Sequence, residues 1–217
     1  MIPCNFSLKH YQSCLETAQK SGYKFLTMKE AVELKAPQKK VIVLRHDIDH
    51  QLRLALKFAK IEKSLGIKAT YFIRLHARYH PFSHKGYRVL KQLKEMNHEL
   101  GLHYDCDFAT LFDEDPRHFL RRDKELFETL IQDKVHGVSP HEPMRSSIKL
   151  TDKEANMHGF LYQAYTNLFT KDMKYISDSS CRWREGCMCE FIKKEEPRLC
   201  ILTHPIWWFK ASPLENY

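Results

Sequence analysis

Two carboxylates and two imidazoles follow an apolar run within ten residues, VIVLRHDIDH at 41–50. The β-branched run at 41–44 predicts a buried strand whose carboxyl end carries Asp47 and Asp49. Parallel α/β proteins place their chemistry at such strand ends, and residues two apart project to the same side. One carboxylate can then bind a divalent cation while the other acts as a base, as metal-assisted hydrolysis requires. The alternative is that an aspartate caps the helix that follows.

Strands and helices alternate along the chain around this segment. Predicted strands cover 41–46, 67–73, 98–104 and 134–140, with further candidates near 160–166, 174–178 and 199–203. Predicted helices cover 7–20, a short segment opened by the capping box Thr27 to Glu30, 54–65 ending at Gly66, 89–96, 116–130 after the start signal Asp115-Pro116, and a weak one at 150–158. This alternation predicts an α/β fold with a parallel sheet and right-handed crossovers, either doubly wound or rolled into a barrel.

Polar residues recur at the carboxyl ends of these predicted strands. A single histidine is usually a structural residue, but structural histidines should fall at either end of a sheet. Recurrence at four or five strand ends on one rim therefore indicates a site. Its candidate members are Asp47, Asp49, His103, Asp105, Asp107, His141, Asp178 and His204.

Length and composition fit one large domain or two small ones. The chain has 217 residues and 43% hydrophobic residues, enough for a proper core, and shows no repeats or linkers. We therefore expect a single domain over 1–217, with a helical N-terminal lead-in at 1–40. There is no apolar signal segment at the start and no run near the roughly 20 apolar residues of a membrane span. We expect a cytoplasmic protein with no membrane span.

Seven cysteines without a signal peptide favour reduced thiols. Cys181, Cys187, Cys189 and Cys200 cluster late, but their spacing C-x5-C-x-C-x10-C lacks the knuckles of structural zinc sites, which favours buried or incidental thiols. The net charge of +8 suits an anionic partner such as nucleic acid, a nucleotide-linked sugar or an acidic glycan. Basic residues are scattered over helix faces without a nucleic-acid-binding signature, so no nucleic-acid partner is expected.

Across nearly its whole length the sequence resembles the polysaccharide deacetylase family, carbohydrate esterase family 4. The similar segments are RHDID at 45–49, ATYF at 69–72, HELGLHYD at 98–105, SPHEP at 139–143, YISDSSCRW at 175–183 and LTHPIWW at 202–208. The resemblance is closest to a divergent branch with RHD-x-D in place of adjacent aspartates, often found among surface-polysaccharide biosynthesis proteins. It implies a distorted (β/α) barrel and a divalent metal, commonly zinc, that hydrolyses an N-acetyl or O-acetyl group on a sugar.

The resemblance assigns roles to particular residues. Asp47 matches the catalytic base and Asp49 a metal ligand of the first motif. In the second motif His103 matches a ligand, and Asp107, four residues later, the next one. Tyr104 departs from the usual Ser or Thr, and Asp105 shares a face with His103 if the strand continues. Three residues therefore compete for the third ligand position, namely Asp105, Asp107 and His141.

The remaining motifs imply the rest of the site. The arginine that normally pairs with the base has no clear counterpart in SPHEP, so Arg45 is a candidate to replace it, and His141 is a candidate ligand or oxyanion contact. His204 matches the general acid, and we expect Asp178 to orient a neighbour such as His204. Trp183, Trp207 and Trp208 suit the apolar face of a sugar ring, with core packing as the alternative. Arg182 and Arg184 suit a phosphate or carboxylate, with a solvated pair as the alternative.

Together these features predict a metal-dependent carbohydrate deacetylase, a hydrolase acting on carbon–nitrogen bonds other than peptide bonds. It would remove an N-acyl group, acetyl or related, from an amino sugar or sugar-containing precursor during surface-polysaccharide synthesis, with zinc as the expected metal. Its partners would be an acylated amino sugar, a nucleotide-linked sugar or a glycan. The alternatives are a metal-dependent amidohydrolase on a cyclic amide or purine-derived substrate, and a non-catalytic sugar-binding protein on the same scaffold.

Overall fold

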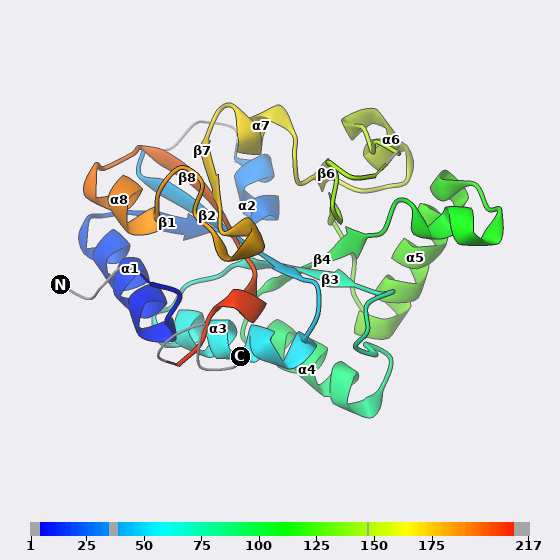
Figure 1. Ribbon diagram of the computed structural model, residues 1–217, viewed down its shortest axis with the longest axis horizontal. Helices are drawn as coiled ribbons and strands as arrows, with labels where there is room; N and C mark the ends of the chain where they lie inside the picture. Colours follow the sequence, from blue (N-terminus) through cyan, green and yellow to red (C-terminus); the bar gives the residue numbers. More distant parts are fainter. Residues whose placement is uncertain (1–4, 35–38, 147, 211–217) are drawn as a thin grey trace.

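Eight parallel strands form one curled sheet in the computed structural model, which describes residues 5–34, 39–146 and 148–210 (Figure 1). The strands are β1 Lys24–Leu26, β2 Val41–Ile48, β3 Thr70–Arg74, β4 Glu99–Tyr104, β5 Gly137–Pro140, β6 Tyr162–Gln163, β7 Lys174–Ser177 and β8 Arg198–Thr203. Their order is β6-β5-β4-β3-β2-β8-β7, with β1 paired to the first residues of β2. The sheet is a half barrel in a single domain, which confirms the predicted fold class.

The helices begin largely where the sequence predicts them. They are α1 Leu8–Lys20, α2 Met28–Glu33, α3 Leu52–Ser64, α4 His84–Glu95, α5 Pro116–Ile131, α6 Asp152–Met157, α7 Asn167–Thr170 and α8 Met188–Lys193, with 3-10 turns η1 Phe108–Phe112, η2 Ser179–Cys181 and η3 Pro205–Trp207. The Thr27 to Glu30 capping box is present, and Asp115 caps α5 with Pro116 in its first turn. Gln51, and no aspartate, stands at the N-cap of α3, so Asp49 is free of that role.

Strand β2 divides the core because all its residues are buried and alternate between two faces. Ile42 and Leu44 pack on the helical side of the sheet, in the larger core cluster. Val41 and Val43 point to the concave side, in a smaller cluster with Phe72. Continuing this alternation brings the next two residues of the concave face, at 45 and 47, to the carboxyl end of the strand.

The N-terminal lead-in differs from the prediction of helices alone. It contains strand β1, which pairs in register with Val41 to Val43. Because β1 has only three residues, it is too short to show a period of two in the sequence. Residues 1–4 and 35–38 of the predicted lead-in lie outside the described residues. Within the described part of the chain, no helix combines the length and apolar character needed to cross a membrane.

Candidate functional site

The carboxyl ends of five strands meet at one edge of the sheet. Parallel pairing aligns these ends, because β2 lies between β3 and β8, and β4 between β3 and β5. The polar residues at or just after the strand ends are Asp47 and Asp49 of β2, His103 of β4, His141 after β5, Asp178 after β7 and His204 after β8. The contacts below show that the structure brings all six together.

Asp49, His103 and His141 form a group that could hold a metal ion. Their ligand atoms all lie within 4.8 Å of one another. His103 Nε2 is 3.0 Å from Asp49 Oδ1, and His141 Nε2 is 3.9 Å from the same oxygen. One carboxylate and two imidazoles are a donor set that suits a borderline divalent ion such as zinc. The residues present therefore fit the metal that the sequence predicts.

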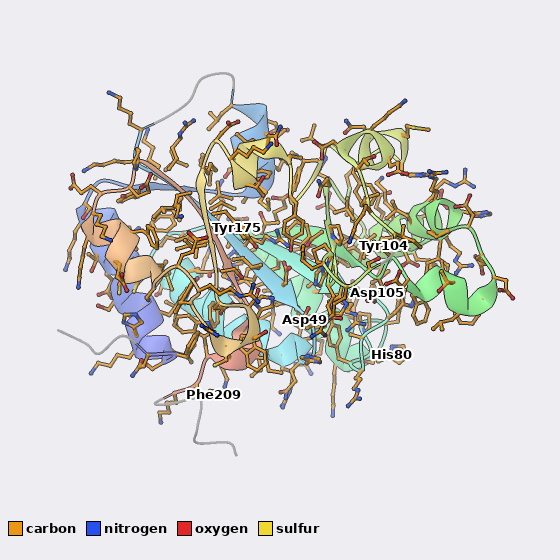
Figure 2. All side chains as sticks on the ribbon, turned by 45° about the horizontal axis from the view of Figure 1, so that its top comes forward. Asp49, His80, Tyr104, Asp105, Tyr175 and Phe209 are labelled. Atoms are coloured by element: carbon orange, nitrogen blue, oxygen red, sulfur yellow. The ribbon has the colours of Figure 1, made fainter. Side chains whose placement is uncertain are left out.

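The two imidazoles of this group are oriented through their other ring nitrogen. His103 Nδ1 lies 2.8 Å from the carbonyl oxygen of Ser139, which can only accept, so Nδ1 carries the proton. His141 Nδ1 lies 3.0 Å from Asp105 Oδ1, and Arg74 Nε donates to both oxygens of Asp105 at 2.8 Å. Both rings therefore direct Nε2, the nitrogen that a bound metal ion would use, toward Asp49, an arrangement typical of metal-ligating histidines. Figure 2 labels Asp49 and Asp105 close together at this edge.

Of the three candidates for the third ligand position, His141 is the one that joins Asp49 and His103 in the candidate metal group. Asp107, predicted as a ligand, lies outside the group: it is exposed, precedes η1 and accepts a hydrogen bond from Ser146 Oγ at 3.0 Å. The chain leaves the strand after Tyr104 and turns into η1, so spacing of four residues from His103 does not return to the ligand face. Asp105 orients His141 instead of joining the ligand atoms.

Asp47 is paired with Arg45 on the concave face of β2. Arg45 Nε donates to Oδ1 at 2.9 Å and Nη2 to Oδ2 at 2.8 Å. Burial by itself raises the pKa of Asp47, but the charge of Arg45, and then of His103, brings that pKa below its ordinary value. His103 Nε2 is 3.7 Å from Asp47 Oδ2, so this ionised carboxylate lies directly beside the candidate metal group.

His204 is held by Asp178 at the other side of β2. Its Nδ1 lies 2.6 Å from Asp178 Oδ1, and Asp178 also accepts the backbone N–H of His204 and the indole N–H of Trp208. Burial lowers the pKa of His204, but the carboxylate of Asp178 outweighs it and raises the pKa to about 9. Its Nε2 is 3.8 Å from Asp49 Oδ2. A protonated imidazole is therefore positioned at the group.

The site opens into a cleft of about 880 Å³. Trp207 and Arg184, two of the candidate substrate contacts, line it. Trp183 does not belong to this lining; its ring stacks on Phe6 at 6.3 Å and meets Trp208 edge-on, so the packing alternative holds for it. The remaining lining includes Asp47, Asp49, His50, His103, His141, Tyr165, Tyr175 and His204.

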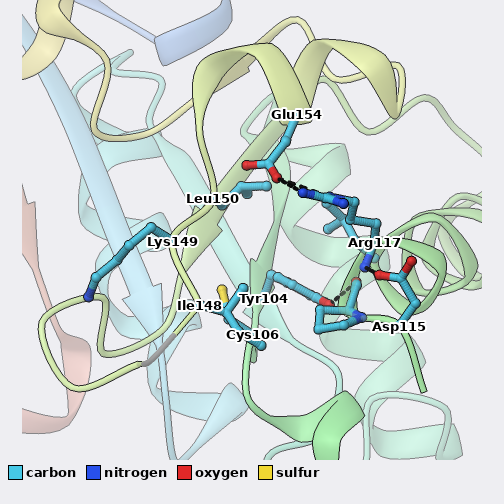
Figure 3. A pocket seen from close by; sticks show the side chains of 10 residues that line it. Tyr104, Cys106, Asp115, Arg117, Ile148, Lys149, Leu150 and Glu154 are labelled. Carbon is cyan, nitrogen blue, oxygen red and sulfur yellow. Dashed lines mark hydrogen bonds and ion pairs between the residues drawn. The ribbon is translucent and has the colours of Figure 1, made fainter. Parts of the chain in front are cut away.

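A smaller cavity of about 190 Å³ adjoins the cleft (Figure 3). The two hollows share Ile148, Lys149 and Leu150 along one loop. On the far side of this cavity Arg117 forms an ion pair with Glu154 at 2.9 Å. None of the catalytic or ligand residues predicted from the sequence lines it.

Sequence reasoning missed three residues that shape the site. Arg74 is the last residue of β3 and donates hydrogen bonds to Asp105. Its position at a strand end is the sequence signal that marks it, as it marks the aspartates and histidines of the site. The hydroxyl oxygen of Tyr165 accepts a hydrogen bond from Arg45 Nη2 at 3.0 Å. Tyr165 and Tyr175 meet at 6.3 Å between ring centroids, from the two ends of the open sheet. No local pattern marks that pair.

Comparisons with known proteins bear on the fold. The sequence matches no protein-family model and no curated protein. Among solved structures, IcaB from Ammonifex degensii is 17% identical with a TM-score of 0.54, over 71% of this chain and 73% of that one. The peptidoglycan deacetylase PdaC from Bacillus subtilis is 16% identical with a TM-score of 0.53, over 82% and 80%. BA3943 from Bacillus anthracis, a carbohydrate esterase family 4 pseudoenzyme, is 19% identical with a TM-score of 0.52, over 78% and 56%.

At this level of identity the likeness shows the fold alone. The chain has the curled parallel half barrel of the carbohydrate esterase family 4 polysaccharide deacetylases, as the sequence resemblance implies.

Proposed function

We propose that the protein is a metal-dependent hydrolase that removes an N-acyl group from an amino sugar or a sugar-containing precursor. This proposal rests on the positions of Asp47 and His204, which both lie beside the candidate metal group. Asp47 Oδ2 is 3.7 Å from His103 Nε2, and His204 Nε2 is 3.8 Å from Asp49 Oδ2. A base and an acid at one metal group are the parts that amide hydrolysis requires.

Asp49, His103 and His141 would hold the divalent ion, with zinc as the expected one. When bound, such an ion polarises the acyl oxygen and makes water more acidic. Asp47, kept ionised by Arg45, takes the proton of the attacking water. The negative charge of Asp178 keeps His204 protonated.

His204 then gives its proton to the departing amine. General acid and base catalysis of this kind contributes about 10²- to 10⁴-fold each. Proton transfer to nitrogen matters because an amine anion is a very poor leaving group. The raised pKa of His204 therefore supports cleavage of an amide over cleavage of an ester, whose alkoxide leaves more easily.

The cleft supports a sugar substrate. Trp207 offers a half-buried ring for the apolar face of a pyranose, and exposed Arg184 offers a charge for a phosphate or carboxylate. PdaC, which has the same fold, is a peptidoglycan deacetylase. Together with the RHD-x-D motif, this supports an acylated amino sugar, nucleotide-linked sugar or glycan as substrate, used in surface-polysaccharide synthesis in the cytoplasm.

Product analysis tests the proposal. Zinc-loaded protein is incubated separately with N-acetylated amino sugars, nucleotide-linked N-acetyl sugars and cyclic amides, and acetate, free amine and ammonia are measured. Acetate and amine in equal amounts are expected from a sugar. Asp47→Asn should abolish them, and Asp172→Asn, an exposed aspartate outside the cleft, should not. Ammonia from the cyclic amides without acetate from any sugar would favour the amidohydrolase alternative.

A non-catalytic sugar-binding protein is a second candidate, because BA3943, described as a pseudoenzyme, has the same fold. In that case the sugars would bind without turnover at any metal loading. Calorimetric titration of the same sugars into wild type and Asp47→Asn separates the two: equal binding with no acetate supports a binding protein, and turnover in wild type alone supports the enzyme.

A further inference from the structure

Four sulfur and imidazole side chains gather between α1 and α8. His10 and Cys14 lie one turn apart on α1, Cys187 precedes α8, and Cys189 lies within it. Figure 1 shows α1 and α8 side by side, although 177 positions separate His10 from Cys187. None of the four lines the cleft, so the cluster is separate from the candidate active site.

The distances within this cluster are those of atoms that share a metal ion. His10 Nε2 is 3.2 Å from Cys187 Sγ and 3.5 Å from Cys14 Sγ. Ligand atoms of His10, Cys187 and Cys189 all lie within 4.8 Å of one another. Zn–S and Zn–N bonds of about 2.3 and 2.05 Å in a tetrahedron separate a nitrogen from a sulfur by about 3.6 Å and two sulfurs by about 3.8 Å. The two nitrogen–sulfur distances of the cluster are close to that nitrogen–sulfur separation.

Burial gives this arrangement a physical reason. The exposed fractions of His10, Cys14 and Cys187 are only 3%, 3% and 2%. A buried ring nitrogen needs a partner, and His10 Nε2 faces two sulfur atoms, which are weak hydrogen-bond partners. A metal ion would replace these weak contacts with coordinate bonds to the same atoms.

We propose that His10 Nε2, Cys187 Sγ and Cys189 Sγ bind one zinc ion, with Cys14 Sγ, which lies 3.5 Å from His10 Nε2 but outside this group of three, moving in as the fourth ligand. Thiolates and imidazole favour zinc over hard cations such as magnesium, and a closed set of four protein ligands is typical of a structural site. The ion would tie the N-terminal helix to the segment before β8. This site does not depend on the proposed function, because it shares no residue with the cleft.

The sequence does not reveal this cluster, because its two parts, H-x3-C at 10–14 and C-x-C at 187–189, are far apart along the chain. The four late cysteines also do not act together. Cys200 lies in β8 and packs in the concave cluster, and Cys181 belongs to η2. Only Cys187 and Cys189 of that group reach α1.

Cobalt titration tests the proposal, because thiolate ligands produce a charge-transfer band in the near ultraviolet that carboxylate and imidazole ligands do not. Metal-free, reduced wild-type protein is titrated with Co²⁺ and followed by absorption and by bound metal per chain. We expect one equivalent of bound Co²⁺ per chain to produce this band together with the strong visible absorption of tetrahedral cobalt. His103→Ala should retain the band, since the cleft group contains no sulfur.

Cys187→Ser/Cys189→Ser should lose the band, and the control Cys181→Ser, which changes a thiol half-buried like that of Cys189, should keep it. A wild-type titration without the band overturns the proposal, and this outcome does not depend on whether the double variant folds. Loss of the band in Cys181→Ser but not in the double variant would also overturn it. Failure of deacetylation alone leaves the cobalt result unaffected, so the two proposals fail separately.

Discussion

Arg45 donates two hydrogen bonds, of 2.9 and 2.8 Å, to Asp47. The two residues are two positions apart and lie on the same face of strand β2. The exposed fractions of the two side chains are 0% and 3%. A buried carboxylate is costly unless a charge and hydrogen bonds compensate for lost water, and a guanidinium supplies both in a fixed geometry. The strand itself thus carries both the base and the group that keeps it ionised.

Replacing Arg45 by Lys should reduce kcat/KM by about 100-fold, because an ammonium group cannot bond both oxygens of Asp47 in that geometry. The weaker partner should also raise the pKa of Asp47, since Arg45 contributes most to lowering it. The acidic limb of the pH profile of kcat/KM should then move to higher pH. Arg121→Lys, at an exposed position, is the control. An unmoved acidic limb would contradict the role given to the pair.

Metal binding should depend on His141 and not on Asp107. His141→Ala removes a candidate ligand, and we expect affinity for zinc at the cleft to fall by at least about 100-fold. Asp105→Asn, which only orients His141, should lower it by about 10- to 100-fold. Asp107→Asn should leave it unchanged. Competition with a chelator of known affinity measures all three, and a loss in Asp107→Asn equal to that in His141→Ala would refute the assignment.

Removing the charge of Asp178 should shift the alkaline limb of kcat. His204 has a raised pKa of about 9 and must be protonated to act as an acid, so activity is retained below that value and lost above it. Asp178→Asn removes the main cause of the raised pKa, so the limb should move to lower pH. Asp172→Asn serves as the matched control. A limb that stays in place in Asp178→Asn would mean that another group titrates there.

Glu62 should matter for stability and not for chemistry, because it lies fully buried on the helical side of β2. Tyr71 donates to it at 2.7 Å, and His46 Nε2 lies 2.9 Å away. Glu62→Gln should lower the free energy of unfolding by about 3 kcal/mol, as breaking a buried charged network does. Urea unfolding measures the loss, with exposed Glu125→Gln as the control.

The pH dependence of that loss has a definite sign. Burial raises the pKa of Glu62, but His46 outweighs it, so the folded pKa lies below the ordinary 4.5. The stabilisation is therefore fully present above pH 4.5 and is lost as pH falls through the lower folded value. The difference between wild type and Glu62→Gln should shrink below pH 4.5. A difference that grows there would contradict the assigned ionisation.

Much of this architecture could be predicted because it depends on local patterns. Apolar periods predicted the strands from β2 to β5 and the helices between them, and Asp115 followed by Pro116 marked the start of α5. A strand end is also a local property, so Asp49 and His103 could be placed on one rim before any contact was known. The three-residue strand β1 escaped because it is shorter than the pattern needed to detect it.

The sequence by itself determined which residues stand at the strand ends and that Asp47 and Asp49 share a face, since a strand's period of two acts within a few residues. Only the tertiary structure decided which candidate joins Asp49 and His103, and which side chains orient His141 and His204. His141 reaches Asp49 because β4 and β5 pair side by side, while the chain turns away at Asp107. His10 likewise meets Cys187 only through the packing of α1 on α8. Such contacts follow from the path of the whole chain, which no short pattern contains.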